Sequence, residues 1–240
     1  MNLKLISSLS HSVKYEDLGL IDFQTAWNYQ ETLFQQIIRQ KTGIDPVPEG
    51  QEPLDGHLLF CEHPHVYTLG KSGVERNLLI SGEMMQRKGI SFFRINRGGD
   101  ITYHGPGQLV GYPILDLDAF HLTIRKYIYI LEEAVIRTLD SFGLNAERLE
   151  GATGVWLEPH TFARKICAIG VRASRNVTMH GFAFNINTDL SFFQFINPCG
   201  FINKGSTSLQ AETGSPGDMD HVKRLMRFHL AELIGFTPVE

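Results

Sequence analysis

The sequence predicts an α+β fold, built from a mostly antiparallel mixed sheet with helices packed on one face. Long segments with apolar residues at three- and four-residue steps occur at residues 22–41, 123–142 and 218–233, which is the period of amphipathic helices. Short apolar or alternating runs lie between them, and three follow closely between residues 154 and 188. A mixture of short strands with a few long helices favours this fold class.

The composition is that of an ordinary globular protein. The 240 residues can bury one substantial core, so we expect a single domain over residues 1–240. Hydrophobic residues make up 42%, charged residues 20%, and the formal net charge is -4, which gives no basic excess for nucleic acid. No run has the length of a membrane span, and the opening MNLKLISSLS reads as a first strand, because it lacks the cleavage pattern of a signal peptide.

The three cysteines Cys61, Cys167 and Cys199 are an odd number without paired spacing. We therefore expect free thiols, a reducing compartment and a cytoplasmic location.

The first half of the chain predicts two helices and several short strands. Asp22 is placed to cap the helix over residues 22–41, and residues 42–56, with three prolines, predict an exposed loop. A short helix is expected near residues 82–88. Strands are expected within residues 3–18 and over 57–62, 66–70, 92–95, 101–103 and 109–115.

The second half predicts a long helix, three strands and a last helix. Gly143 ends the helix over residues 123–142. The strands are expected at 154–159, 164–171 and 177–188, and the last helix at 218–233.

Residues 97–111, RGGDITYHGPGQLVG, are the strongest candidate for a functional site. Five glycines surround a short strand and let the backbone turn sharply and approach a ligand closely. Arg97, Tyr103, His104 and Gln108 add a cation, a phenol, an imidazole and an amide. The alternative is a hairpin whose polar residues are solvated, but the density of glycines and polar groups favours a pocket wall.

Further candidate residues come from the other segments. Lys165, in RKICAIG, is either a partly desolvated amine or an edge lysine that reaches water, and the residues alone leave both open. Cys199 stands between turn-forming residues in NPCG and is expected to be accessible, whereas Cys61 lies in an apolar run and is expected to be buried. His63 and His65 flank a proline, and without carboxylate or thiol partners they do not indicate a metal site.

The stretch RGGDITYHGPGQLVGYPILDL resembles the signature of the octanoyltransferases of lipoate biosynthesis, the octanoyl-acyl-carrier-protein:protein N-octanoyltransferases. EHPHVYTLG, RKICAIG, MHGFAFN and PCGF resemble further segments of the family, and the resemblance extends from about His57 to Ile202. It implies the catalytic-domain fold of the biotin and lipoate protein ligases.

The resemblance also implies a reaction and the residues that perform it. Cys199 would form an acyl-thioester with the octanoyl group of octanoyl-acyl carrier protein, with Lys165 as its activator. The group would then pass to the lipoyl-domain lysine of 2-oxoacid dehydrogenases and glycine-cleavage proteins, without ATP, cofactor or metal. The residues implied to bind substrate are Arg97, Gly98, Gly99, Asp100, Ile101, Thr102, Tyr103, His104, Ala168, Ile169, Gly170, His180, Gly181, Phe182 and Ala183.

Some residues are less informative than others for this resemblance. The family varies at Asp100, so that residue adds little to the resemblance. Phe182 and Phe184 are expected to line an acyl slot, to pack in the core, or both. Cys167 stands where the family generally has a small residue, and on a regular strand it would share a face with Lys165. We favour Cys199 as the nucleophile because Cys167 lies in an apolar run, which raises the pKa of a thiol.

Two other functions fit the sequence less well. An ATP-dependent lipoate or biotin protein ligase would have no use for a nucleophilic cysteine. A non-catalytic module that binds acyl carrier protein or lipoyl domains would need neither Lys165 nor Cys199. Arg94, Arg172 and Arg175 are candidates for contact with an acidic carrier protein, although ordinary solvation explains them equally well.

Overall fold

The computed structural model describes residues 11–46, 54–197 and 205–239. The strands in these ranges are β1 (His11–Leu20), β2 (Gly56–Glu62), β3 (Val66–Leu69), β4 (Ser91–Arg94), β5 (Ile101–His104), β6 (Gln108–Leu115), β7 (Ala146–Leu149), β8 (Ala152–Leu157), β9 (Arg164–Ser174), β10 (Val177–Asn185), β11 (Gly205–Ser206) and β12 (Phe236–Val239). The α-helices are α1 (Phe23–Lys41), α2 (Gly82–Arg87), α3 (Ile124–Asp140), α4 (Leu209–Thr213) and α5 (Met219–Ile234). Two 3-10 helices are η1 (Glu75–Asn77) and η2 (Leu190–Phe195).

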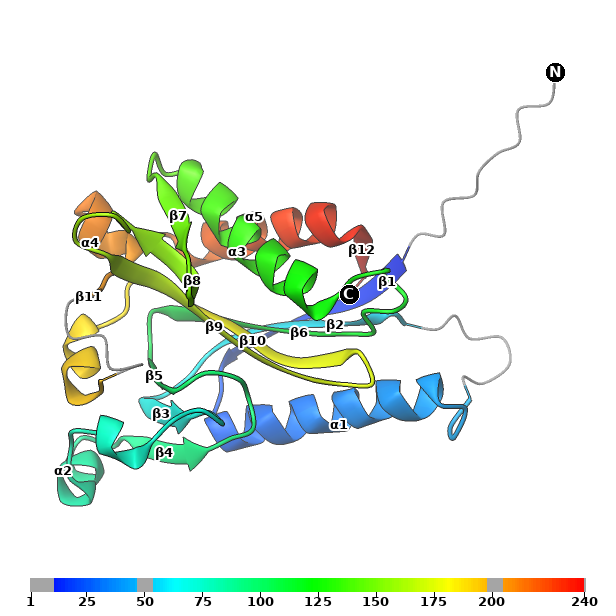
Figure 1. Ribbon diagram of the computed structural model, residues 1–240, viewed down its shortest axis with the longest axis horizontal. Helices are drawn as coiled ribbons and strands as arrows, with labels where there is room; N and C mark the ends of the chain where they lie inside the picture. Colours follow the sequence, from blue (N-terminus) through cyan, green and yellow to red (C-terminus); the bar gives the residue numbers. More distant parts are fainter. Residues whose placement is uncertain (1–10, 47–53, 198–204, 240) are drawn as a thin grey trace.

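A large mixed sheet forms the centre of the molecule, in the strand order β12-β1-β2-β6-β10-β9-β8-β7 (Figure 1). From β2 to β7 all neighbours pair antiparallel. The strand β1 pairs parallel with both β12 and β2, and β11 pairs parallel with β9. A smaller sheet, β4-β3-β5, lies beside one end of α1 (Figure 1). The predicted α+β class with a mostly antiparallel mixed sheet is confirmed.

Helices cover both faces of the large sheet, so the prediction that they pack on one face is wrong. The helices α3 and α5 lie on one face and α1 lies on the other (Figure 1). Leu58 and Phe60 of β2 belong to the hydrophobic cluster with α3 and α5, whereas Leu59 and Cys61 belong to the cluster with α1. A strand that is apolar on both sides needs a cover on each face.

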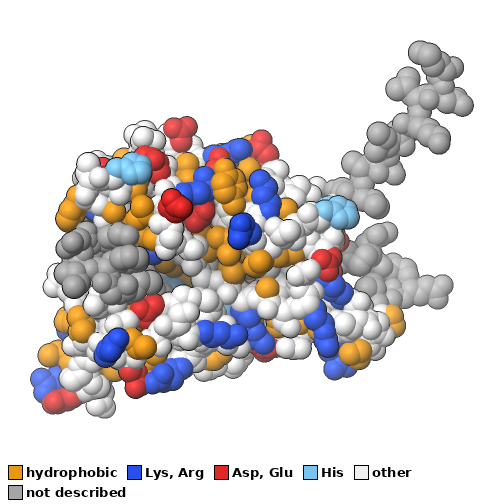
Figure 2. Space-filling view, viewed as in Figure 1, with side chains coloured by type: hydrophobic (Ala, Val, Ile, Leu, Met, Phe, Trp, Pro, Cys, Tyr) orange, Lys and Arg blue, Asp and Glu red, His pale blue; other side chains and the backbone are white. Residues whose placement is uncertain are grey.

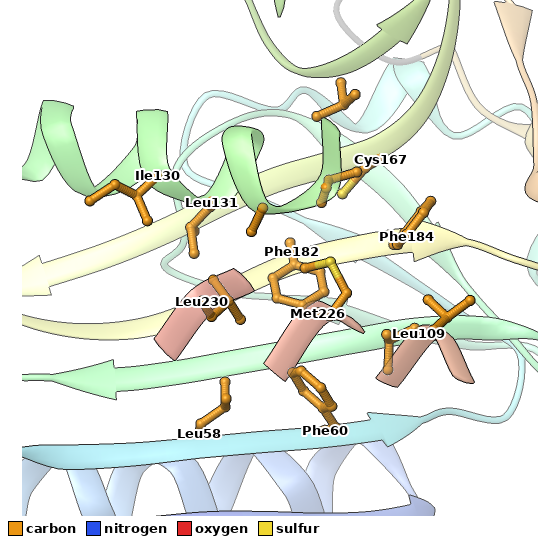
Figure 3. Close-up of a cluster of buried hydrophobic side chains, with 14 of the residues drawn as sticks. Leu58, Phe60, Leu109, Ile130, Leu131, Cys167, Phe182, Phe184, Met226 and Leu230 are labelled. Carbon is orange, nitrogen blue, oxygen red and sulfur yellow. The ribbon is translucent and has the colours of Figure 1, made fainter. Parts of the chain in front are cut away.

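The largest hydrophobic cluster lies between the sheet and the helix pair α3 and α5. Figure 3 shows Ile130 and Leu131 of α3, and Met226 and Leu230 of α5, around Phe182 of β10. All five side chains are at most 2% exposed. Because each buried side chain of this size contributes about 1.5–3 kcal/mol, this cluster fixes β10 and its neighbours firmly in the sheet.

The long helices begin at capping side chains. Asp22 accepts a hydrogen bond from the backbone N–H of Thr25 at 3.0 Å, as the sequence predicted. Thr123 caps α3 in the same way, and Asp218 caps α5. Each cap satisfies a backbone donor that has no partner within the helix and typically contributes about 1 kcal/mol.

Some elements differ from the expectation. The strand β9 continues to Ser174 and forms a hairpin with β10, and the turn residues Arg175 and Asn176 have positive φ angles of 51° and 59°. Two consecutive residues of this kind make the tight turn that matches strand twist. The short elements β7, β11, β12, α4, η1 and η2 were not anticipated, because too few residues show a period. Residues 3–10 of the expected first strand, and 47–53 of the expected loop, lie outside the described residues.

Candidate active site

A cavity of about 310 Å³ is lined by residues of both sheets. Its lining comes from β6, β10, β9 and β8 of the large sheet, from β5 and the residues preceding it, from η2 and β11, and from the first residue of α1. A mostly enclosed space of this kind with a few polar groups is the usual form of a small-molecule site.

Glycines allow the segment before β5 to lie directly against the large sheet. The backbone N–H of Gly98 donates to the carbonyl of Val171 on β9 at 2.9 Å. A Cβ at Gly170 would lie 2.9 Å from the Gly98 oxygen, and one at Gly181, its partner on β10, would lie 2.2 Å from the Gly111 oxygen. Side chains at 170 and 181 would therefore force these backbones apart.

Buried polar side chains form one wall of the cavity. Arg97 Nη2 donates to the Thr68 carbonyl at 2.7 Å and to Thr68 Oγ1 at 3.0 Å, and Thr68 Oγ1 lies 3.3 Å from His104 Nε2. His104 Nδ1 lies 2.8 Å from Gln108 Oε1, and Gln108 Nε2 donates to Asn185 Oδ1 at 2.9 Å. Because an amide oxygen only accepts, His104 carries its proton on Nδ1.

His180 has an unusual conformation for a residue within a strand. Its φ is 61°, its side chain lines the cavity, and its backbone N–H donates to Gln30 Oε1 of α1 at 3.2 Å. His180 is 2% exposed, and its Nε2 has no hydrogen-bond partner among the described residues. Burial, and then the charge of Arg97, lowers the pKa of His180 to about 3, and burial likewise lowers the pKa of His104 to about 3. Both rings are neutral at pH 7.

A β-bulge directs Lys165 into the cavity. Along β8, Val155 and Trp156 pair with Cys167 and Lys165 of β9, so Ile166 is an extra residue on β9. A bulge changes the face to which the following side chains point. Lys165 Nζ lies 4.6 Å from the centre of the Trp156 ring.

The same bulge separates the two residues that alternation places together. Cys167 is fully buried in the cluster beneath α3 and α5, whereas Lys165 lines the cavity. The expectation that they share a face is therefore wrong. Burial raises the pKa of the Cys167 thiol, and burial also raises that of Cys61, so neither buried thiol forms a thiolate readily.

Cys199 lies outside the described residues, but the residues on both sides of it are placed. The backbone N–H of Asn197 donates to the Asn77 carbonyl at 2.8 Å. On the other side, Ser206 pairs with Lys165 in the β11–β9 ladder, and Ser206 lines the cavity. Asn185 Nδ2 donates to the carbonyl of Thr207 at 2.9 Å.

The structure brings most of the other predicted site residues together. The predicted residues that line the cavity are Arg97, Gly99, Asp100, Ile101, Thr102, His104, Lys165, Ala168, Ile169, Gly170, His180, Gly181, Phe182 and Ala183. Gly98 and Tyr103 are not in the lining. Gly98 bonds to β9, and the Tyr103 hydroxyl bonds to His65 Nδ1 at 2.7 Å on the other side of the small sheet. Phe182 and Phe184 both pack in the core, and of the two only Phe182 also lines the cavity.

Other lining residues carried no sequence signal that singled them out. Phe23, Val110 and Tyr112 read as ordinary apolar positions of a helix and a strand, and Trp156 as a strand residue. The further lining residues not predicted are Ile95, Gly151, Ala152, Thr153, Asn185, Phe193, Gly205 and Ser206. Gln108, one of the polar groups of the glycine-rich stretch that favoured a pocket wall, also lines the cavity.

The histidines around Pro64 belong to separate hydrogen-bond networks. His63 Nε2 lies 2.7 Å from the Tyr112 hydroxyl, and His63 Nδ1 lies 2.8 Å from the Ile21 carbonyl. His65 bonds to Tyr103 instead. No group of three or more His, Cys, Asp or Glu side chains within residues 11–46, 54–197 and 205–239 is placed to share a metal ion.

Comparison with known proteins agrees with this fold and shows a family. Residues 22–231 match the family model described as the lipoyl protein ligase A/B catalytic domain. An octanoyltransferase of Cytophaga hutchinsonii is 53% identical over 225 residues, which cover 92% of each chain. One of Bacteroides fragilis is 54% identical over 220 residues, covering 91% of this chain and 96% of the relative.

Solved structures show the same architecture at low identity. A bipartite lipoate protein ligase from Thermoplasma acidophilum is 17% identical with a TM-score of 0.66, covering 96% of this chain and 86% of that chain. A biotin protein ligase from Aquifex aeolicus, in complex with biotin and ATP, is 14% identical with a TM-score of 0.51, covering 92% of this chain and 70% of that chain.

This chain thus shares its fold with lipoate and biotin protein ligases. The chain belongs to the lipoyl protein ligase A/B catalytic-domain family and, within it, to the octanoyltransferases, which are acyltransferases.

Proposed function

We propose that this octanoyltransferase transfers an octanoyl group from octanoyl-acyl carrier protein to the lysine of a lipoyl domain, through a thioester on Cys199. The chain acts in this reaction as one domain. The observation that carries the proposal is the position of Lys165 on β9, which lines a largely apolar cavity and pairs with Ser206 of β11. The cavity suits an acyl chain, and the amine suits proton transfer at its carbonyl end.

The first step forms the acyl-enzyme. An unassisted thiol has a pKa of about 8.5, so a nearby base or cation is needed to generate the thiolate at neutral pH. Lys165 serves this purpose by accepting the proton of the Cys199 thiol. The sulfur then attacks the donor carbonyl, the C–S bond to the carrier breaks, and the leaving carrier thiolate takes up the proton that Lys165 had accepted, so Lys165 is neutral again before the second step.

The second step releases the enzyme. The neutral amine of the lipoyl-domain lysine attacks the Cys199 thioester, the C–S bond breaks, and Lys165 accepts the proton of the amine. A thioester is already activated, so no nucleotide enters either step. Gly98 is a poor candidate for stabilising the carbonyl oxygen, because its N–H donates to Val171.

The free thiols of Cys61 and Cys167 support a reducing, cytoplasmic setting for this reaction. No helix in the described part of the chain combines the length and apolar character needed to cross a membrane.

The surface charge bears on the approach of an acidic carrier protein. Figure 2 shows basic and acidic side chains intermixed on the face seen there. Two of the three arginines expected to meet the carrier form ion pairs within the chain, Arg94 with Glu75 and Arg172 with Glu31. Such pairs reduce the charge that is available to a partner.

The test is to incubate the purified protein with octanoyl-acyl carrier protein without nucleotide and to measure its intact mass. We expect a gain of one octanoyl group that is lost in Cys199→Ser and kept in Cys167→Ser. The control is matched because both variants exchange one sulfur for oxygen, but Cys167 is buried in the core. An adduct that persists in Cys199→Ser would overturn the assignment, and modification of a lipoyl domain that requires ATP and free octanoate would favour the ligase instead.

A further inference from the structure

The cavity lining is more exposed beside β8 and β9 than beside Val110 and Phe23. On the β8 and β9 side, Thr153 and Gly151 of the lining are exposed and Lys165 is half-buried. On the β6 side, Val110 is 1% exposed, and the other apolar residues there, Phe23 and Ile95, are 3% and 8% exposed. An acyl group whose carbonyl lies near Lys165 therefore points its methyl end toward β6.

The path between these two sides crosses the sheet. The lining passes from Trp156 on β8 over Ala168 on β9 and Ala183 on β10 to Val110 on β6. Four adjacent strands are separated by three spacings, or about 14 Å in all. An extended octanoyl chain has seven C–C bonds of about 1.5 Å, and its zigzag spans roughly 9 Å. The octanoyl chain is thus about 5 Å shorter than the path, which leaves room at the entrance for the thioester and the Lys165 amine.

Small residues keep the middle of this path open. Ala168 and Ala183 are directly opposite each other in the β9–β10 ladder, and cross-strand partners point to the same face. Both line the cavity, and Ala183 packs with Val110 in the cluster beneath α1. A larger side chain at either position would project into the path.

The side of the cavity beside Phe23 is rigid. The Phe23 ring lies 5.2 Å from the Phe93 ring, 5.3 Å from the His63 ring and 6.0 Å from the His104 ring, measured between centroids. Its backbone begins α1 directly after the capping residue Asp22. Phe23 and Ile95 also pack in one hydrophobic cluster. Close packing of this kind resists deformation by a longer ligand.

We propose that Phe23 and Ile95, together with Val110 of the same cavity lining, form the wall that limits acyl chain length, and that the pair Ala168 and Ala183 forms the channel leading to it. This inference rests on the proposed function, because it assumes that the acyl carbonyl lies near Lys165. It identifies the residues that would make that site selective for medium-length saturated chains.

The first test enlarges the cavity at Phe23. Phe23→Ala is compared with wild type for transfer from hexanoyl-, octanoyl-, decanoyl- and dodecanoyl-acyl carrier protein. We expect the ratio of kcat/KM for decanoyl over octanoyl to rise about tenfold or more, since the fit of one methylene typically changes selectivity by 10- to 200-fold. Phe228→Ala, at a 61% exposed position on α5, is the matched control and should keep the wild-type ratio.

The second test blocks the middle of the path with a larger side chain. Ala183→Leu should lower octanoyl transfer and raise the ratio of hexanoyl over octanoyl by about tenfold, opposite to Phe23→Ala. Ala173→Leu, at an exposed position of the same hairpin, is the control. Thermal melting shows whether each variant is folded.

A second measurement separates this inference from the proposed function. Binding of hexanoate, octanoate, decanoate and dodecanoate is measured by calorimetry to each variant carrying Cys199→Ser, which removes the proposed chemistry. If wild type forms no octanoyl-enzyme, the proposed function fails whatever these affinities are. If folded Phe23→Ala and Ala183→Leu keep the wild-type order of both transfer and affinity, the wall is elsewhere and the inference is overturned.

Discussion

His180 combines an unfavourable backbone conformation with the burial of a polar side chain in the wall of the cavity. Its positive φ costs an L-residue on the order of 1–2 kcal/mol relative to the right-handed alternative. Its imidazole is buried with Nε2 lacking a hydrogen-bond partner in the described structure. The surrounding sheet and α1 hold this arrangement, and its result is a neutral ring on the wall of the cavity.

Replacing His180 should therefore reverse the usual order of glycine and alanine in a strand. Both His180→Gly and His180→Ala lose the ring, but only glycine adopts φ 61° without strain. We expect His180→Gly to be more stable than His180→Ala by about 1 kcal/mol. Urea unfolding measures this difference, and an alanine variant as stable as the glycine variant would show that the backbone relaxes once the ring is gone.

Single residues also show what the sequence can predict. The apolar run around Cys61 predicted a buried thiol, and the structure confirms it at 0% exposure. The glycine-rich stretch predicted a pocket wall from residue types alone. The sequence does not indicate the backbone conformation of His180. Alternation assigns His180 an ordinary strand position, and only its contact with α1 distinguishes it.

At the scale of elements, one extra residue in β9 determines to which side of the sheet Lys165 and Cys167 point. Regular alternation would place Lys165 beside Cys167 in the core, where a lysine would be strongly destabilising. Ile166 interrupts the register with β8, so the amine reaches the cavity and the thiol stays in the core. Sequence patterns record the apolar character of this run but not its pairing partner, so the bulge was not foreseen.

The strands β6 and β10 approach each other more closely than side chains permit at Gly181. An added Cβ would lie 2.2 Å from the Gly111 oxygen and 2.7 Å from Pro113 Cδ. We expect Gly181→Ala to lower the free energy of unfolding by about 1–3 kcal/mol through overpacking.

The control for this variant is Gly82→Ala at the start of α2, where nothing lies within 4 Å of the added Cβ. Alanine is the better helix former there, so unfolding should be unchanged or slightly harder. Chemical denaturation compares the two variants. Equal stability of both would mean that β6 and β10 separate without strain.

For the whole molecule, two buried histidines of the cavity wall link stability to pH. His104 and His180 have pKa values of about 3 in the folded protein, against 6.5 for an ordinary histidine. Between these values the unfolded chain binds more protons than the folded one, so their contribution is complete above pH 6.5 and is lost as the pH falls toward 3.

Each of the two rings should change the free energy of unfolding by about 1.4 kcal/mol per pH unit in this window. His180→Asn removes one of them while retaining a residue that tolerates positive φ. We expect its unfolding free energy to fall less steeply between pH 6 and pH 4, by about that amount per unit. His160→Asn, at a 79% exposed side chain, should keep the wild-type slope. Identical slopes in urea titrations of wild type and His180→Asn would contradict the assignment.

The sequence predicted the overall class of fold better than its layers. Helical and strand periods identified the long helices and most strands, because these patterns depend on local residues. That α1 covers the opposite face from α3 and α5 depends on strand order, which periodicity does not reveal. The continuously apolar β2 and β6 were the available sign that both faces are covered.

The position of β1 has a consequence for how the protein is made. This strand lies between β2 and β12, and its partner residues on β12 run from Phe236 to Val239. During synthesis, β1 leaves the ribosome early but one of its edges has no native neighbour until the last of these residues has emerged. Since an open strand edge pairs readily with other strands, nascent chains on one messenger are most exposed to mispairing in the interval before β12 pairs with β1.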